Sequence, residues 1–372
     1  MLAAFTEGGG SETRTANARV PDVEGAEHRE DTVLVTGGSG FLGGWCLVEL
    51  LRRGFRVRTT VRNLSREAEV RANLASQVDV GDRLSVFAAD LSGDDGWQEA
   101  TRGCDYVLHV ASPFPPAQPK DPDELIIPAR DGALRVLGAG LESGVRRVVL
   151  TSSTAAVRNS GETPPPGPLT EEDWTDPDNP HLTPYARSKT IAEQAAWELA
   201  REKGDVGRLT VVNPSAILGP VLSDDLSYSL EVITRMLNGM PGVPRLGFSF
   251  VDVRDVADLQ VSAMTAPEAA GERFLAAGPF LWLSEVAEIL RDRLGPAAAK
   301  VPRRTVPNLI VRAMARFDPG LRSVVGELGQ EVTYSSAKAG TRLGWSPRPM
   351  EETIVDCAQS LARGEAAGEQ AA

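Results

Sequence analysis

VLVTGGSGFLGG, residues 33–44, is the stretch that decides the fold. Its apolar first part is typical of a buried strand, its glycines predict a turn, and Leu47, Leu50 and Leu51 follow at helical spacing. The segment therefore predicts a strand, a glycine-rich loop and a helix in succession. This order suits the phosphates of a dinucleotide, because the start of a helix offers free N–H groups and a positive dipole.

The glycines of this loop have separate expected roles. A tight turn is expected at Gly37 or Gly38, close approach of the backbone to a pyrophosphate at Gly40, and close packing of helix on strand at Gly43. The residues expected to hold the phosphates are Gly37, Gly40, Phe41, Leu42 and Gly43. A flexible loop is the alternative interpretation, but it would not require the strand before and the helix after.

Composition limits the classes of function. The 372 residues are enough for two domains, or for one domain with a sizeable lobe. Asp and Glu number 51 against 39 Lys and Arg, so the formal charge of −12 predicts repulsion of nucleic acid and of anionic membrane surfaces. No apolar run is long enough to span a membrane. A small-molecule substrate is the expected partner, with the chain a monomer or a homodimer.

Cysteine and histidine usage predicts neither disulfides nor a metal site. Cys46, Cys104 and Cys357 are far apart in apolar surroundings, which favours reduced thiols in the cytoplasm. The three histidines show no metal-ligand spacing. Residues 1–30 lack the apolar centre of a signal peptide, and we expect them and the tail 364–372 to be disordered.

Between these ends, short apolar strands alternate with helices. The expected strands are 33–36, 55–61, 84–88, 106–110, 145–150 and 209–213, and the expected helices include 66–76, 128–143 and 185–202. This alternation predicts an α/β fold, a doubly wound parallel sheet of the Rossmann type over residues 31–214. After Pro214 the alternation weakens, and residues 215–363 are expected to form a smaller mixed substrate lobe.

The end of the second strand indicates which cofactor is bound. An acidic residue there would suit the ribose of NAD, whereas an arginine suits the extra phosphate of NADP. The segment reads RVRTTVRNLSRE, which favours NADP and makes Arg62 the expected phosphate contact. Arg58 and Arg66 are equally well explained as solvated surface residues. Asp90, after the third strand, could contact the adenine or could be an ordinary turn residue.

The helix expected over residues 185–202 carries the candidate chemistry. Tyr185 and Lys189 are four residues apart and therefore lie on one face. A tyrosine is a usable proton donor to a reduced carbonyl only where positive charge stabilises its anion, and Lys189 would supply that charge. Ser153 or Ser152, at the end of the preceding strand, would hydrogen-bond the carbonyl oxygen. A snorkelling lysine beside a half-buried tyrosine is the alternative, but the nucleotide loop argues against it.

Taken together, TGGSGFLGG, TSST, YARSK and NPSAILGP resemble the extended short-chain dehydrogenase/reductase superfamily. The segments RTTVRN, HVASPF, IAEQAAW, FVDVRDVAD and RLGWSPR are similar to its dihydroflavonol reductase, cinnamoyl-CoA reductase and microbial aldehyde/ketone reductase branch. The resemblance covers about residues 32–361. It implies a carbonyl reductase that uses NADPH, with Ser153, Tyr185 and Lys189 as the catalytic residues.

The resemblance also implies further cofactor contacts. They are Arg62 at the NADP phosphate, Asp90 and Leu91 beside the adenine, His109, Val110, Ala111 and Ser112 along the cofactor, and Asn213, Pro214 and Ser215 at the nicotinamide. The sequence departs from plant flavonoid reductases at Arg158, where those enzymes carry a polar amide. This departure argues against a dihydroflavonol substrate.

Two other functions remain open from the sequence. A sugar-nucleotide epimerase or dehydratase with retained NAD shares the glycine loop and the tyrosine–lysine pair. A non-catalytic NADP-binding sensor or scaffold is the second alternative, although it would not require all three catalytic residues. The sequence indicates neither the substrate nor its stereochemistry.

Overall fold

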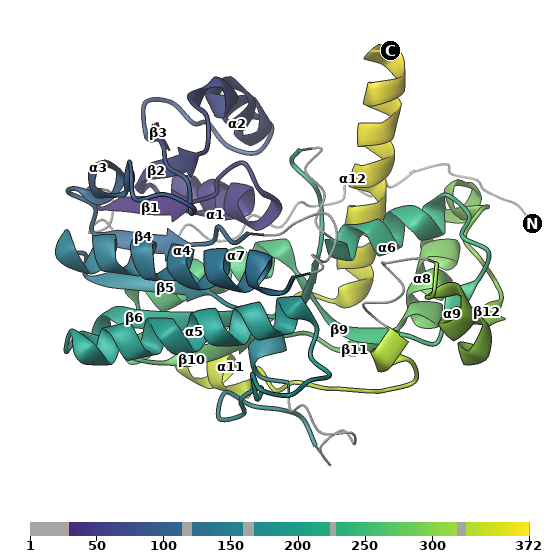
Figure 1. Ribbon diagram of the computed structural model, residues 1–372. Coiled ribbons are helices and arrows are strands. Elements are labelled where there is room, and N and C mark those ends of the chain that lie inside the picture. The colour runs from purple at the N-terminus through teal and green to yellow at the C-terminus, as the bar shows by residue number, and fades with distance from the viewer. Residues whose placement is uncertain (1–29, 114–120, 159–166, 224–227, 318–324, 372) are drawn as a thin grey trace, which may run out of the picture.

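The computed structural model describes residues 30–113, 121–158, 167–223, 228–317 and 325–371 (Figure 1). Its largest element is a seven-stranded sheet in the order β10-β6-β5-β4-β1-β2-β3, in which every neighbouring pair is parallel. The strands are β1 (Thr32–Thr36), β2 (Arg56–Val61), β3 (Leu84–Ala88), β4 (Tyr106–His109), β5 (Arg147–Thr151), β6 (Leu209–Pro214) and β10 (Arg273–Ala276). The predicted doubly wound parallel sheet is thus confirmed.

Helices cover both faces of this sheet (Figure 1). They are α1 (Phe41–Arg52) and α7 (Val253–Thr265) on one face and α3 (Trp97–Thr101), α4 (Asp123–Glu142) and α5 (Pro184–Glu202) on the other. Alternation along β1 explains this division, because Val33 and Val35 pack with α1 and α7 whereas Leu34 packs with α4 and α5. A strand buried on both sides reads as a continuous apolar run.

The order of winding reverses at β1. This strand has β2 on one side and β4 on the other, so the loops after β1 and β4 lead toward opposite faces. Ligands of doubly wound sheets bind at such a switch point, beyond the carboxyl ends of the strands. The residues that follow β1 and β4 are therefore where the functional site is expected.

A smaller lobe lies beside the carboxyl edge of the sheet (Figure 1). It contains the strands β7 (Ala216–Leu218), β8 (Val243–Pro244), β9 (Gly247–Asp252), β11 (Phe280–Trp282) and β12 (Thr305–Val306) and the helices α6 (Tyr228–Leu237), α8 (Leu283–Leu294), α9 (Asn308–Met314) and α12 (Met350–Ala371). Leu230, Phe250, Leu290 and Ile354 belong to its own buried core. The remaining elements are α2 (Glu67–Ala75), α11 (Ala337–Leu343), η1 (Leu64–Arg66), η2 (Thr154–Ala156), η3 (Val206–Arg208), η4 (Pro267–Ala269), η5 (Gly295–Ala298) and η6 (Val325–Glu327).

Two boundaries differ from those expected. The larger domain does not end at Pro214, because α7 and β10 return to it and β10 pairs with β6 as the seventh strand. The tail 364–372, expected to be disordered, is helical in α12 as far as Ala371. The sequence GEAAGEQAA is rich in Ala, Glu and Gln, which extend a helix once it has been nucleated. The expected disorder of residues 1–30 falls almost entirely outside the described residues.

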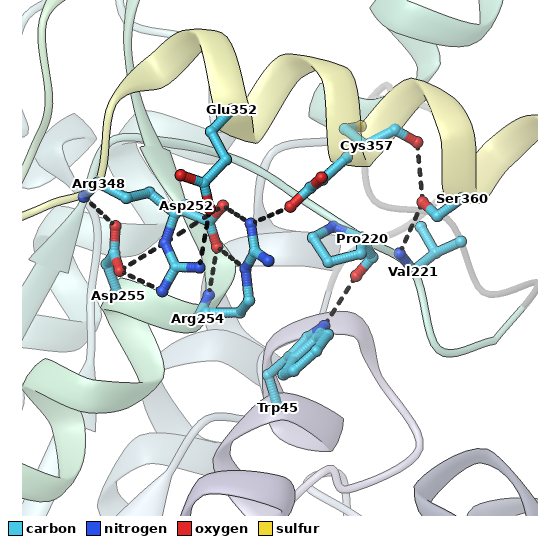
Figure 2. A network of polar contacts seen from close by, with 11 residues as sticks. Trp45, Pro220, Val221, Asp252, Arg254, Asp255, Arg348, Glu352, Cys357 and Ser360 are labelled. Atoms are coloured by element: carbon cyan, nitrogen blue, oxygen red, sulfur yellow. Dashed lines mark hydrogen bonds and ion pairs between the residues drawn. The ribbon is translucent and has the colours of Figure 1, made fainter. Parts of the chain in front are cut away.

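A polar network fixes the smaller lobe to the sheet (Figure 2). The buried carboxylate of Asp252 pairs with Arg254 at 2.7 Å and with Arg348 at 3.8 Å. Arg348 also pairs with Asp255 at 2.8 Å, and Arg254 with Asp356 of α12 at 2.8 Å. Because burial of a lone charge is costly, these reciprocal pairs keep the carboxylates and guanidiniums together. Charges from α7, α12 and the segment before α12 thereby hold the two parts in register.

Candidate active site

The glycine loop has the shape that a bound phosphate requires. Gly37 has a φ of 73°, and its carbonyl accepts from Gly40 N at 3.0 Å, so the tight turn is at Gly37. A Cβ at Gly43 would lie 2.1 Å from the Gly37 oxygen, and one at Gly38 would lie 2.1 Å from Thr59 Oγ1. Only glycine fits at these two positions.

The helix that follows this loop begins without a side-chain cap. Gly40 is the N-cap of α1, and no side chain accepts from the first N–H groups of the helix. Among the described residues other than its two neighbours in the chain, a Cβ at Gly40 would have only the Gly37 oxygen within 4 Å, at 3.4 Å. Uncapped N–H groups beside open space are what a pyrophosphate would need, so this loop fits a dinucleotide.

Two arginines stand near the loop beyond β2. Arg62 is exposed directly after the strand, and its charge helps to lower the pKa of Asp90. Arg66, which could equally have been a solvated surface residue, donates from Nη1 to Ser39 Oγ of the glycine loop at 3.1 Å. Arg58, by contrast, donates to the Arg102 carbonyl at 2.7 Å and lies over the Phe87 ring.

Asp90 is held in a turn. Its Oδ1 accepts from Ser92 N at 2.8 Å and from Ser92 Oγ at 2.7 Å, and these bonds are the main reason that its pKa is lowered. The neighbouring Leu91 packs on α4 at Gly132. The turn interpretation of Asp90 therefore has direct support.

The end of β4 is tied to the end of β1 through Thr36. Its Oγ1 is 2.8 Å from His109 Nδ1 and accepts from Val110 N at 3.1 Å and Ala111 N at 3.0 Å. A Cβ at Gly37 would lie 3.0 Å from Ala111 Cβ. The backbone of residues 109–111 thus lies directly beside the glycine loop, where the resemblance places the cofactor.

Tyr185 and Ser153 are brought together across the sheet edge. Tyr185 lies in the first turn of α5, where Thr183 caps the helix, and Ser153 follows β5. Burial raises the pKa of Tyr185, and a hydrogen bond with the Ser153 side chain opposes this rise. The phenol is therefore protonated at neutral pH.

The Ser152 hydroxyl points elsewhere. Its Oγ donates to Glu193 Oε2 at 2.6 Å, inside the protein. Of the two serines that the sequence could not separate, Ser153 is the one bonded to Tyr185, and Ser152 belongs to a buried network.

Lys189 lies one turn after Tyr185 and is 9% exposed. Its Nζ donates to the Thr151 carbonyl at 3.4 Å. Burial lowers the pKa of Lys189 to about 8, and the Glu193 carboxylate opposes this change. Lys189 and Glu193 also line a small cavity with His109, Ser112, Thr151 and Ser152. The ammonium thus loses its proton in a mildly alkaline range.

Glu193 is a buried carboxylate that the sequence analysis missed. It is 0% exposed and accepts from Asn213 Nδ2 at 2.7 Å and from Arg273 Nε at 2.6 Å, besides the bond from Ser152. Its position one helical turn after Lys189 was the available signal, because a glutamate on the inward stripe of a helix needs a buried partner. That partner, Arg273, lies on the unpredicted strand β10.

The carboxyl end of β6 and the residue after it offer unpaired polar atoms. Asn213 Nδ2 also donates to the Ser153 carbonyl at 3.1 Å, so this amide group faces the carboxyl end of β5. Asn213 Oδ1 and Ser215 Oγ are buried and have no hydrogen-bond partner within the described residues. Buried polar atoms normally have partners, so these atoms fit a polar group of a bound ligand. Pro214, between them, is the last residue of β6.

Arg158 is engaged within the protein. Its Nη1 pairs with Glu327 at 2.6 Å, and its Nη2 donates to Gln330 Oε1 at 3.2 Å. The guanidinium is therefore neutralised by the smaller lobe.

No group of His, Cys, Asp or Glu side chains with the arrangement of a metal site occurs in the described part of the chain. The three cysteines are free and buried. None of the helices among the described residues has the length and apolar content of a membrane span.

Comparisons with known proteins point to one family. The sequence profile of the NAD dependent epimerase/dehydratase family matches residues 33–277. Cinnamoyl-CoA reductase 1 of Petunia hybrida is 38% identical over 261 residues, 69% of this chain and 76% of its own length. Dihydroflavonol 4-reductase of Zea mays is 33% identical over 82% of this chain and 81% of its own.

A solved structure extends the similarity to the fold. Yeast methylglyoxal/isovaleraldehyde reductase Gre2, crystallised with NADPH, superposes with a TM-score of 0.76 at 26% identity. The match covers 90% of this chain and 99% of that one. The likeness therefore includes both the sheet and the smaller lobe.

Proposed function

The chain belongs to the NAD dependent epimerase/dehydratase family, and we propose that it uses NADPH to reduce an aldehyde or ketone to the alcohol. It is an oxidoreductase of the extended short-chain dehydrogenase/reductase superfamily, similar to reductases over most of its length. The observation that carries the proposal is the hydrogen bond between Ser153 and Tyr185, one helical turn from the buried Lys189.

The cofactor would be held by residues of the sheet edge. The glycine loop from Gly37 to Gly43 and the start of α1 would bind the pyrophosphate, and Arg62 and Arg66 would bind the additional phosphate of NADP. Val110, Ala111 and Ser112 would line the cofactor, and Asn213 Oδ1 and Ser215 Oγ would receive its amide end. When bound, NADPH supplies the hydride that reduces the carbonyl carbon.

Tyr185 is the proposed proton donor. Its phenol keeps its proton at neutral pH and can pass it to the carbonyl oxygen as negative charge develops there. The Ser153 hydroxyl donates a hydrogen bond to the same oxygen and lowers the cost of that charge. The phenolate left on Tyr185 is then stabilised by the Lys189 ammonium.

The direct test is NADPH oxidation against a panel of aldehydes, ketones and keto esters, with NADH as comparison. We expect turnover with NADPH, and we expect Tyr185→Phe to lose about 10²-fold or more in kcat while still binding NADPH. Retention of most activity by Tyr185→Phe would overturn the mechanism. Purified protein that carries tightly bound NAD and oxidises no NADPH would instead support an epimerase or dehydratase.

Binding of NADPH without turnover across the panel would revive the non-catalytic alternative.

Arg158 also bears on substrate choice. Because Glu327 neutralises its guanidinium, the structure offers no reason to expect an acidic substrate at this position. The panel should therefore include neutral carbonyl compounds of several sizes.

A further inference from the structure

The smaller lobe exposes a cluster of apolar side chains on α9. Of the seven large apolar side chains that lie exposed in the described part of the chain, four fall within residues 309–317. Leu309 is 80% exposed and Phe317 is 89% exposed, and Ile310 and Met314 are the other two. A clustered apolar surface of this kind marks a contact site far more often than scattered single residues do.

The helix geometry separates this cluster from the lobe core. Val311 and Ala315 are buried and anchor α9 on the core, and Ala315 N bonds to the Val311 carbonyl at 2.9 Å. Ile310 and Met314 are four residues apart and lie on one face of α9, and the exposed Phe317 follows in the turn directly after the helix. We call Leu309, Ile310, Met314 and Phe317 the α9 stripe.

Basic residues flank the α9 stripe. Residues 300–317 contain five basic residues and no acidic residue, in a chain whose formal charge is −12. Arg303, Arg304 and Arg312 are exposed and lie within the same stretch of sequence. The local charge is thus opposite to that of the whole chain, and it complements an anionic surface.

We propose that the α9 stripe docks on a bilayer surface that contains anionic lipids. Leu and Phe side chains beside arginines are typical of segments that insert shallowly between lipid headgroups. A stable protein partner normally buries roughly 20–30 residues a side, far more than this short segment offers. Helix α9 lies on the outer side of the smaller lobe (Figure 1).

Vesicle flotation of the full chain tests this proposal. We expect binding to vesicles containing phosphatidylglycerol, weakened by high salt, and at least about tenfold weaker binding to phosphatidylcholine alone. Leu309→Ser with Phe317→Ser should abolish binding while keeping the melting temperature and carbonyl reduction. The double variant Arg303→Gln/Arg304→Gln should weaken vesicle binding. The control is Arg201→Gln/Lys203→Gln, which removes the same charge from exposed positions at the end of α5 and should leave vesicle binding unchanged.

Several outcomes would overturn the proposal. The first is that the protein binds neither kind of vesicle. The second is that the Leu309/Phe317 variant binds as well as the wild type. The third is that the α5 control loses as much vesicle binding as the Arg303/Arg304 variant. A dimer that is abolished by the Leu309/Phe317 variant, with no vesicle binding, would assign the stripe to a second copy of the chain. Because carbonyl reduction is measured separately, failure here leaves the proposed function untouched.

Discussion

Arg273 donates from Nε to the Glu193 carboxylate at 2.6 Å, and both side chains are closed off from solvent. The pair joins β10 to α5, and the same carboxylate holds Ser152 and Asn213 at the ends of β5 and β6. The Glu193 carboxylate therefore joins the carboxyl ends of β5 and β6, near Ser153, to the start of β10. It also lies one turn from Lys189, whose ammonium it favours.

Glu193→Gln should change the pH profile. Removal of the carboxylate takes away an interaction that favours the charged form of Lys189, so the Lys189 pKa should fall below its value of about 8. The alkaline limb of kcat should move to lower pH by about one unit. Glu198→Gln, exposed on the same helix, is the control. An unchanged limb with a lower melting temperature would mean that Glu193 acts on stability alone.

Activity and stability measurements should distinguish the roles of Ser153 and Ser152. Ser153→Ala removes a hydrogen bond to Tyr185 and should lower kcat about 10²-fold with little change in the KM for NADPH. Ser152→Ala removes a buried bond to Glu193 and should lower the free energy of unfolding by about 2 kcal/mol with a much smaller effect on kcat. The reverse pattern would transfer the proposed role to Ser152.

Arg62 and Arg66 should determine the preference for NADPH. Arg62→Ser or Arg66→Ser should raise the KM for NADPH about tenfold and leave that for NADH nearly unchanged, because only NADPH carries the extra phosphate. Arg56→Ser is the matched control, since Arg56 is exposed at the opposite end of β2. Equal effects on both cofactors would show that the arginines support the loop rather than the phosphate.

His109 should make the fold sensitive to acid. Burial, with the added charge of Lys189, lowers the pKa of His109 to about 3 from an ordinary value of 6.5. The unfolded chain therefore takes up this proton first as the pH falls, so the stability that His109 contributes is present above pH 6.5 and is lost between 6.5 and 3.

The loss should be about 1.4 kcal/mol for each pH unit in that window. Urea unfolding of the wild type and of His109→Gln, measured from neutral pH downward, checks this. The variant should show a shallower slope. Equal slopes would place the acid sensitivity in other groups.

The regular part of the fold could be predicted because its signals are local. The continuous apolar run of β1 and the inward stripe of α5 each report burial within a few residues. Strand β10 has no such signal: it is short, follows the smaller lobe, and is defined by pairing with the distant β6. The helical end of α12 could not be predicted, because its composition is typical both of helices and of solvated tails.

Some residues of the candidate site could likewise be predicted from local signals, and others could not. Tyr185 and Lys189 could be recognised from their spacing on one helix, whereas the choice between adjacent serines depends on where each hydroxyl points. Arg66 is placed near the site only by its hydrogen bond to Ser39, and the role of Glu193 is visible only from its contact with Arg273. Contacts between residues far apart in sequence leave no periodic pattern to read.

The return of β10 to the sheet has a consequence for synthesis on the ribosome. Strand β6 leaves the ribosome long before β10, so β6 lacks its pairing partner on one side until residue 276 has emerged. Over the same interval the Glu193 carboxylate has no Arg273 with which to form its ion pair. A chain that stalls within the smaller lobe thus exposes the unpaired side of β6 together with a carboxylate that lacks its arginine, and it should be a preferred target of chaperones and proteases.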